Sequence, residues 1–536
     1  IGKTFWSVLG WTLIWAVLAT FLNYIFGMIL AIVINRKTTR IKGFWRFCFM
    51  LSAAIPQFVS LLLMRTMLKD NGLVNNLLIQ AGLISSPLPF LTNATWARAT
   101  VVIINLWVGI PFTMMQVTGI LQNIPGELYE AARVDGAGPV TIFFKITLPY
   151  MLFVTTPYLI TTFTGNINNF NVIYLLTAGA PVPVGATAGK TDLLVTWLYK
   201  LTVDLQYFNV GAVVGILTFV ILAGGFTDHV PEYWFLQERG GIPIMNNKEK
   251  KTHSMKARGM ISDVVVHVVL ALLAIVWVIP VLWIALLSFS TQKGSYVTSF
   301  FPKGYTLHNY VRLFTDTQVL DFPQMFKNTF IIAVFSCLIS TIFVLSVSYC
   351  MSRMRFKIRK TYMNIAMILG LFPAFMSMVA VYYILKAVGL SEGSMIRVAL
   401  ILVYSGGSGA GFLLAKGFFD TVPKALDEAA YLDGATRFQV FTKVTIPLSK
   451  PIIVYTTLSA FLGPWLDFIF AKVICRANAK YYTVALGLWK MLEKVYIDSW
   501  YTCFAAGAVC ISVPIAILFV VMQRYYTDGL SGAVKG

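Results

Sequence analysis

Long apolar stretches separated by short polar segments dominate the chain. Crossing a bilayer as a helix takes roughly 17–25 apolar residues, and nearly all of these stretches are long enough. They contain Gly and Pro and do not alternate apolar with polar residues, so helices are favoured over barrel strands. The pattern predicts an all-α integral membrane protein with about eleven transmembrane helices, over residues 5–34, 44–66, 99–122, 148–165, 208–225, 261–289, 328–352, 361–387, 396–419, 446–472 and 503–523.

Composition supports a membrane protein and argues against a nucleic-acid partner. Hydrophobic residues make up 58% of the 536 positions and charged residues 12%, against roughly 45–50% and 25% in soluble proteins. The net charge of +20 comes largely from clusters at 36–46, 248–258 and 353–360, between apolar stretches. Short basic loops mark the cytoplasmic side, and one topology places all three clusters and the C-terminal tail inside.

Cysteine and histidine spacing predicts neither a disulfide framework nor a metal site. The six cysteines have no CxxC spacing and mostly lie in or near apolar stretches, where packing is the favoured interpretation. Cys475 and Cys503 flank one predicted outer loop, so a disulfide there stays an alternative. The four histidines are scattered along the chain, which disfavours a shared metal ion.

An internal repeat relates the two halves of the chain. YEAARVDGAG at 129–138 resembles DEAAYLDGAT at 427–436, and further upstream the offset between the halves is near 325. The first half therefore carries about 27 extra residues, in the outer loop 67–98. This predicts two parallel halves related by an axis along the membrane normal. An offset of 298 relates Pro125 to Pro423, Glu130 to Glu428, Lys145 to Lys443, Pro149 to Pro447, Asn169 to Asp467 and Phe170 to Phe468.

The expected domains are a first half over 1–225 with five spans and a second half over 260–536 with six spans. Residues 226–259 are expected to form a tail and linker, and Met245 stands at the head of its polar basic part. The first half lacks a counterpart of the span at 261–289. We therefore expect two subunits written as one chain, the first truncated at its N-terminus. A single natural polypeptide stays an alternative.

The repeated stretch predicts a short helix-turn-helix outside the bilayer. Pro125 and Gly126 break the preceding span, after which ELYEAARV forms two helical turns. Asp135-Gly136 makes a turn, and Pro139 starts a second helix that Pro149 ends. One such copy could be an ordinary amphipathic interfacial loop. Two copies with identical internal spacing favour a specific role.

Both copies contain EAA followed a few residues later by a Gly, and about a dozen residues further by I-T-L-P in the first copy or V-T-I-P in the second. This pattern resembles the cytoplasmic loop of binding-protein-dependent ABC importer permeases. The first half looks most like the larger subunit of maltose/maltodextrin-type importers, and the second half like the smaller. In that family the loop is a coupling helix that docks on a cytoplasmic ATPase. The coupling residues that the resemblance implies are Glu130, Ala131, Ala132, Asp135, Gly136, Glu428, Ala429, Ala430, Asp433 and Gly434.

A polar path through the membrane would need hydrogen-bonding groups, and intramembrane polar residues are costly. The resemblance to the larger subunit implies substrate contacts at Gln57, Asn105, Val108, Gly109, Gly165, Asn166 and Asn169. Bonding between helices, worth roughly 0.6–2 kcal/mol for each polar pair, is the alternative. Ala53 and Gly165 replace aromatic residues of the family, so a more open site is expected. In the second half Val403 stands at the position of Asn105 and Pro464 at that of Asn166, which predicts a lopsided site built mainly by the first half. Asp467 is interpreted as a gating or packing residue.

GATAGKT at 185–191 only superficially resembles a phosphate-binding loop. It has three residues where the motif needs four, and it lies in the outer loop 166–207 with no strand before it. We therefore predict no nucleotide cofactor in this chain and no enzymatic activity, with ATP and Mg bound by a partner. The outer loops 67–98, 166–207 and 471–502 are expected to meet a solute-binding protein.

The resemblance implies the transmembrane pathway of an ATP-driven importer in the bacterial cytoplasmic membrane. Its partners would be two cytoplasmic ABC ATPase subunits, an extracellular or periplasmic solute-binding protein, an oligosaccharide and membrane lipid. The tail at 529–536 would reach toward the ATPases. The alternatives are an ion-coupled secondary sugar transporter, an ABC importer of a non-sugar solute, and a membrane enzyme. Which sugar is carried stays open.

Overall fold

The computed structural model describes residues 2–36, 38–124, 126–227, 257–292, 299–317, 320–369, 374–406 and 411–534. Every regular element within these ranges is a helix, which confirms the all-α prediction. One isolated β-bridge joins Ser290 to Tyr305. Pro125, Met245 and nearly all of the predicted linker 226–259 lie outside the described residues.

The helices of the first half alternate long apolar segments with short pieces at loops. In order they are α1 Gly2–Asn35, α2 Lys42–Ala54, α3 Gln57–Met67, α4 Leu73–Gln80, α5 Ala94–Asn123, α6 Gly126–Val134, α7 Pro139–Ile142, the π-helix η1 Phe143–Thr147, α8 Leu148–Ile167, α9 Phe170–Leu176, α10 Leu194–Tyr199, the π-helix η2 Lys200–Asp204 and α11 Phe208–Thr227.

The second half follows the same order after one additional helix. Its elements are α13 Ala257–Ser288, α14 His308–Thr315, α15 Phe322–Arg353, α16 Arg359–Leu369, α17 Ala374–Ala387, α18 Met395–Gly406, α19 Gly411–Thr421, α20 Lys424–Leu432, α21 Arg437–Val440, the π-helix η4 Phe441–Thr445, α22 Ile446–Leu448, α23 Lys450–Leu466, α24 Ile469–Cys475, the 3₁₀ helix η5 Ala479–Tyr481, α25 Val484–Met491 and α26 Ile497–Val534.

Fewer helices than the eleven expected are long enough by themselves to cross a membrane. Within the described residues five are, and up to seven if two bent helix pairs each count as one span. Pro56 marks one bend, where α2 and α3 meet at 82°. Ser449 marks the other, between α22 and α23. Proline and serine interrupt these apolar stretches because both weaken the helical hydrogen-bond ladder.

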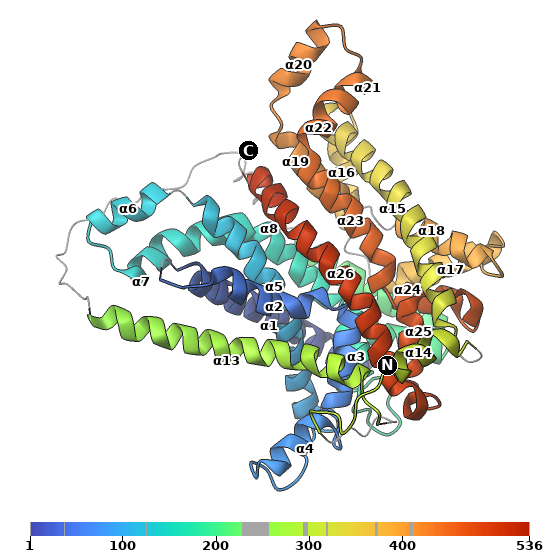
Figure 1. Cartoon of the computed structure of the whole chain (residues 1–536). Coiled ribbons are helices and arrows are strands. Elements are labelled where there is room, and N and C mark those ends of the chain that lie inside the picture. Colours follow the sequence, from blue (N-terminus) through green and yellow to red (C-terminus); the bar gives the residue numbers. More distant parts are fainter. Residues whose placement is uncertain are drawn as a thin grey trace.

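The two halves form two arms of corresponding helices (Figure 1). In the first arm α1 packs against α5 and α8, and in the second α15 packs against α19 and α23. The short pairs α6–α7 and α20–α21 lie at the tips of the two arms, well away from α4, α14 and α25. This arrangement agrees with the predicted parallel repeat.

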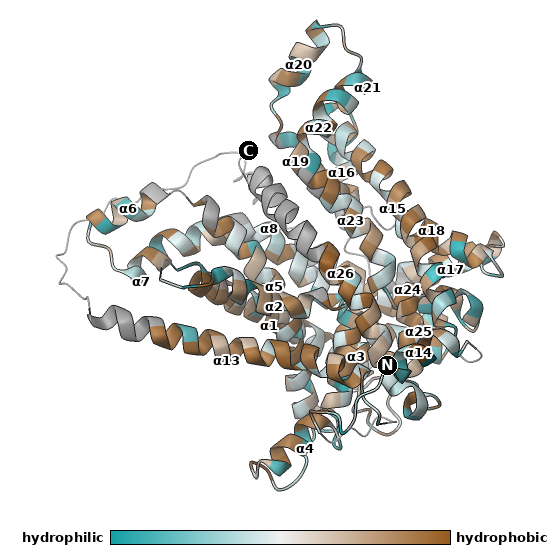
Figure 2. Ribbon diagram, in the orientation of Figure 1, coloured by the Kyte–Doolittle hydropathy of each residue, from teal (hydrophilic) through white to brown (hydrophobic). Residues whose placement is uncertain are grey.

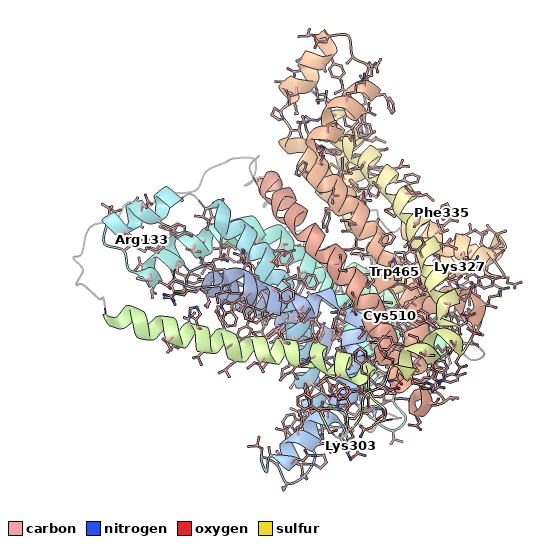
Figure 3. All side chains as sticks on the ribbon, viewed as in Figure 1. Arg133, Lys303, Lys327, Phe335, Trp465 and Cys510 are labelled. Atoms are coloured by element: carbon pink, nitrogen blue, oxygen red, sulfur yellow. The ribbon has the colours of Figure 1, made fainter. Side chains whose placement is uncertain are left out.

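Hydropathy follows the arms and changes at their tips. Figure 2 shows brown, apolar ribbon along much of α13, α15 and α23, whereas α6, α7, α20 and α21 carry teal, polar residues. Figure 3 places Arg133 at the tip of the first arm and Lys303 at the opposite end of the molecule, near α4. The helix α13 of the second half packs on α2 of the first. Its Trp277 Nε1 donates to the Trp107 carbonyl oxygen at 2.9 Å.

Candidate functional site

The first repeated loop ends its leading helix α6 with a left-handed residue. Gly136 has a φ of 77°, and its N–H donates to the Arg133 carbonyl oxygen at 3.0 Å. The Ala137 N–H donates to the Ala132 carbonyl oxygen at 2.8 Å. These two bonds form a Schellman motif, in which glycine avoids the strain that a Cβ meets at positive φ. The predicted Asp135-Gly136 turn is confirmed as the C-terminal cap of α6.

The second loop has the same backbone hydrogen bonds at the end of α20. Gly434 has a φ of 81°, and its N–H donates to the Tyr431 carbonyl oxygen at 3.0 Å. The Ala435 N–H donates to the Ala430 carbonyl oxygen at 2.9 Å. Each donor and acceptor lies 298 residues after its counterpart in the first loop. The sequence repeat is therefore also a repeat of backbone structure.

Each loop then begins a second short helix at the same relative position. Pro139 is the first residue of α7, after Gly138, which confirms the predicted start. Arg437 is the first residue of α21, where Thr436 and Gln439 form a capping box. The Gln439 N–H donates to Thr436 Oγ1 at 3.3 Å, and the Thr436 N–H donates to Gln439 Oε1 at 2.8 Å. Different residues thus produce one helix-turn-helix shape.

Pro149 does not end the second helix, so that prediction was wrong. The chain passes through the π-helix η1 and continues directly into α8, whose first turn contains Pro149. Proline is tolerated in a first turn because the N–H that it lacks has no required partner there. In the second half Pro447 has the corresponding place in α22, and Ser449 follows as the interruption before α23.

The loop tips expose acidic and apolar side chains at matched positions. The candidate coupling residues Glu130, Ala131, Asp135, Glu428, Ala429, Asp433 and Gly434 are exposed, and Ala132, Gly136 and Ala430 are partly buried. Among the residues that the structure describes, these four carboxylates form no ion pair. Val134 is 87% exposed and its counterpart Leu432 is 90% exposed. Further exposed apolar counterparts are Leu128 and Leu426, and Val140 and Phe438.

A buried ion pair anchors the second loop to α15. Arg353 Nε lies 3.2 Å from Asp427 Oδ2, and the two side chains are only 5% and 8% exposed. Arg353 Nη2 also donates to the carbonyl oxygens of Phe419 and Val422, at 3.0 and 2.7 Å, at the C-terminal end of α19. A cation there is favoured by the helix dipole. One guanidinium therefore joins α15, α19 and α20.

Within the described part of the first loop no equivalent ion pair is found. The counterpart of Asp427 is Tyr129, whose hydroxyl lies 3.3 Å from Thr147 Oγ1 within the same loop. Arg353 belongs to the basic cluster 353–360, which sequence alone marks only as cytoplasmic. The signal that could have revealed the pair was an acidic residue directly before Glu428, absent at the matching place in the first loop.

Asn166 is occupied in bonds between α8 and α1. It is 7% exposed, and its backbone carbonyl oxygen accepts a hydrogen bond of 3.0 Å from Trp15 Nε1. Its Nδ2 donates to Thr20 Oγ1 at 3.0 Å, and Asn169 Nδ2 lies 3.4 Å from its Oδ1. This is the structural role that the sequence left open as the alternative to sugar binding.

Asn169 and Asp467 occupy equivalent positions, and each accepts a hydrogen bond from a backbone N–H of the short helix that follows it. Asn169 Oδ1 accepts from the Val172 N–H at 3.3 Å at the start of α9. Asp467 Oδ2 accepts from the Ala471 N–H at 3.3 Å in α24, and Tyr404 Oη donates to it at 2.8 Å. Side chains 298 residues apart thus bind the first turns of the helices that follow α8 and α23, with Asn169 as the N-cap of α9 and Asp467 one residue before the N-cap of α24.

The remaining candidate substrate residues lie on α3, α5 and α8. Asn105 is buried, at 6% exposed, and Val108 is partly buried on the same helix. Gly109 allows close helix packing, because a Cβ there would lie 2.6 Å from Asn23 Oδ1 on α1. Since α5 packs against α8 and α9, the candidate residues of α5 lie on a helix that neighbours those carrying Gly165, Asn166 and Asn169. Gln57 is partly buried at the start of α3, and Gly165 is exposed with nothing near a Cβ position.

The glycine-rich segment 185–191 is held by a carboxylate of the chain itself. Gly189 N–H and Lys200 Nζ each donate to Asp192 Oδ2 at 2.6 Å. Burial raises the pKa of the Asp192 carboxyl, although the nearby Lys200 charge acts in the opposite direction. The Lys190 N–H donates to the Pro181 carbonyl oxygen at 2.9 Å. The backbone N–H groups of Gly189 and Lys190 therefore form hydrogen bonds within the loop itself.

The capping role of Asn169 can be separated from substrate contact by two substitutions. Asn169→Leu should destabilise the chain by about 1 kcal/mol, because α9 loses its N-cap, whereas Asn169→Asp should retain stability. Thermal unfolding of the purified chain measures both. If Asn169→Asp keeps wild-type stability but reduces solute uptake several-fold, the amide contacts solute. If uptake by Asn169→Asp is normal, Asn169 is a capping residue only.

Comparison with known families identifies the class of protein that this fold and these paired loops define. The family described as binding-protein-dependent transport system inner membrane component matches residues 23–230 and 345–531. The chain therefore belongs to this family and contains its domain twice. It is a multi-pass protein of the cell membrane.

The similar curated proteins are bacterial sugar permeases. The galactooligosaccharides transport system permease protein GanP of Bacillus subtilis (strain 168) is 41% identical over 220 residues, which cover 41% of this chain and 53% of that protein. The maltodextrin transport system permease protein MdxF of the same strain is 39% identical over 231 residues, covering 41% and 52%. The galactooligosaccharides permease GanQ is 34% identical over 284 residues, covering 53% of this chain and 99% of its own. The chain spans about half the length of GanP and MdxF.

Proposed function

We propose that the chain forms the transmembrane pathway of an ATP-driven carbohydrate importer. It would receive an oligosaccharide from an extracellular solute-binding protein and would be driven by two separate ABC ATPase subunits, which bind ATP and Mg. The observation that carries this proposal is the pair of exposed helix-turn-helix loops with one backbone structure. Two equivalent docking elements at the arm tips suit two equivalent partners.

The chemistry of the loop tips supports docking on another protein. Apolar side chains such as Val134 and Leu432 are almost fully exposed outside the long apolar helices, and exposed apolar groups rimmed by polar ones are typical of interaction sites. Exposed Glu130 and Glu428 can accept hydrogen bonds from a basic partner surface. We assign the ATPase-coupling role to these loops.

The choice of carbohydrate as solute rests on the relatives and on the amides of the first half. GanP and GanQ are named for galactooligosaccharides and MdxF for maltodextrin. In this chain the amides of Asn105, Asn166 and Asn169 lie on α5, on α8 and just before α9. Because Asn166 is held by Trp15 and Thr20, we expect its role to be support of the pathway wall. Asn105 is then the stronger candidate for direct contact.

The outer ends of both halves offer a surface for a solute-binding protein. Exposed apolar residues gather in the segments that precede or follow α4, α10, α14 and α25, and they include Leu83, Val182, Val184, Phe301 and Val495. The extra segment 67–98 of the first half contributes α4 to this end (Figure 1). We propose that these outer segments accept the binding protein.

Purification of the tagged full-length chain from its host membrane tests this function. A nucleotide-hydrolysing protein should copurify, and adding the solute-binding protein with galactooligosaccharide or maltodextrin should raise ATP hydrolysis several-fold. The Asn105→Leu variant should bind the ATPase but lose most of this stimulation. Solute uptake that follows an ion gradient and needs no ATP would instead favour the secondary transporter.

A further inference from the structure

Two equivalent positions of the halves touch one another. Tyr174 of α9 and Lys472 of α24 lie 298 residues apart, the offset that relates the two halves. Lys472 Nζ donates to Tyr174 Oη at 2.5 Å. Residues related by a twofold axis can contact each other only where both lie close to that axis. The Tyr174–Lys472 pair therefore marks the pseudo-twofold axis between the halves.

Aromatic rings from both halves surround the Lys472 ammonium. Its Nζ lies 4.7 Å from the ring centroid of Tyr174 and 5.4 Å from that of Tyr199, both of the first half. It lies 5.6 Å from the centroid of Phe468 and 4.2 Å from that of Trp489, both of the second half. We call these four rings and the lysine the axial box.

The rings of the axial box also contact one another across the boundary between the halves. Tyr174 stacks on Phe468 with centroids 6.3 Å apart, and Tyr174 meets Tyr199 edge-on at 5.0 Å. Phe468 and Trp489 lie 5.1 Å apart. Within the described residues no carboxylate lies within 4.0 Å of Lys472 Nζ. Ring faces and one hydroxyl contact this cation, and the more distant charges of Asp204 and Glu493 also favour it.

The axial box lies at the outer end of the molecule. Its helices α24 and α25 are far from the arm tips α6–α7 and α20–α21 (Figure 1). A motion that separates the halves at this end must separate Lys472 from Tyr174, because the two residues belong to opposite halves and meet at the axis. The stack of Tyr174 on Phe468 crosses the same boundary, and Lys472 adds a charged contact to it.

We propose that the axial box is a latch, in which Lys472 of the second half holds the outer ends of the two halves together until solute delivery separates them. This latch rests on the proposed importer function, because only an importer that alternates between inward and outward opening needs it. Lys472 acts as a positioning residue, and it contacts the first-half rings without being a substrate contact.

Basal ATP hydrolysis by the assembled complex, without binding protein or solute, tests the latch. Lys472→Met should raise it several-fold, because the methionine side chain keeps the bulk but loses the charge. Lys472→Arg should restore low basal hydrolysis, since a guanidinium also binds aromatic faces. Lys490→Met is the matched control, because Lys490 pairs with Glu493 of its own half and touches the box only at the Trp489 ring, 5.4 Å from its Nζ. Equal basal hydrolysis in Lys472→Met and wild type would overturn the latch.

Amine labelling of the chain gives a readout that does not depend on the ATPase. In wild-type membranes a water-soluble acylating reagent should modify Lys472 about five-fold more slowly than Lys490, as measured by peptide mass spectrometry. Tyr174→Ala should speed labelling of Lys472 and leave Lys490 unchanged. Equal labelling of both lysines in wild type would overturn the box. A wild-type complex without solute-stimulated ATPase would refute the importer function while this labelling result still stood.

Discussion

Replacing both Gly136 and Gly434 with tryptophan should reduce solute uptake more than ten-fold without removing the chain from the membrane. Both glycines end a helix at positive φ, 77° and 81°, where any other residue is strained by roughly 1–2 kcal/mol. In this chain a Cβ on Gly434 would meet nothing within 4 Å. The side chain added at Gly434 would therefore project toward whatever docks on the second loop, and transport should uncouple from ATP hydrolysis.

Gly389 provides the matched control for backbone strain. It has a φ of 78°, and a Cβ there also meets nothing within 4 Å, but it lies in the outer connection between α17 and α18. Gly389→Trp should cost about as much stability as either loop substitution alone and leave uptake near the wild-type level. Uptake of labelled solute, normalised to the amount of chain in the membrane, measures both variants. If the double variant transports as well as Gly389→Trp does, the loops have no coupling role.

The paired loops could be predicted in detail because their structure is locally encoded. A glycine after a short helix, with a proline three residues later or a capping residue two residues later, is a signal that acts within a few residues. The Asp135-Gly136 turn is therefore predictable from the sequence, and the repeat places Gly434 at the matching position. The one wrong detail, the end of the helix at Pro149, arose because proline is compatible with both a stop and a first turn.

The polar residues of the pathway could not be resolved from sequence because their partners are distant in the chain. Asn166 is fixed by Trp15 and Thr20, more than a hundred residues earlier, and nothing near Asn166 announces these bonds. The hydrogen bonds that Asn169 and Asp467 accept from the following helices become visible only when α9 and α24 are seen to begin nearby. Residue type predicted a hydrogen-bonding site but left its partner undetermined.

The number of helices long enough to cross the membrane could not be predicted from the hydropathy pattern alone. Hydropathy averages over a window, and it therefore merges α2 with α3 and α22 with α23 into single apolar stretches. The bends depend on where Pro56 and Ser449 meet the packing of neighbouring helices. Apolar length thus predicted membrane crossing, whereas the bent pairs required the three-dimensional structure.

Arg353→Met should have the second large effect, because it leaves Asp427 buried without its partner. Removing one member of a buried ion pair typically costs about 3–5 kcal/mol. Here the loss should release α20 from α15 and α19, since the guanidinium contacts all three. We expect a clear drop in the thermal stability of the chain and loss of most solute uptake. Lys416→Met is the control, because its pair with Asp420 is more exposed and such pairs contribute about 0–1 kcal/mol.

A double variant distinguishes an unpaired charge from a lost anchor. Arg353→Met combined with Asp427→Leu removes both charges, so it should recover much of the stability that Arg353→Met loses. Uptake should stay low if the ion pair itself transmits motion between α15 and the second loop, and it should recover if the pair only avoids a buried charge.

Tyr129→Phe, at the matching place in the first loop, removes only a bond within that loop. It should change uptake little, because the two loops share a backbone structure but only the second is anchored by an ion pair to α15. Equal losses in Tyr129→Phe and Arg353→Met would contradict this asymmetry.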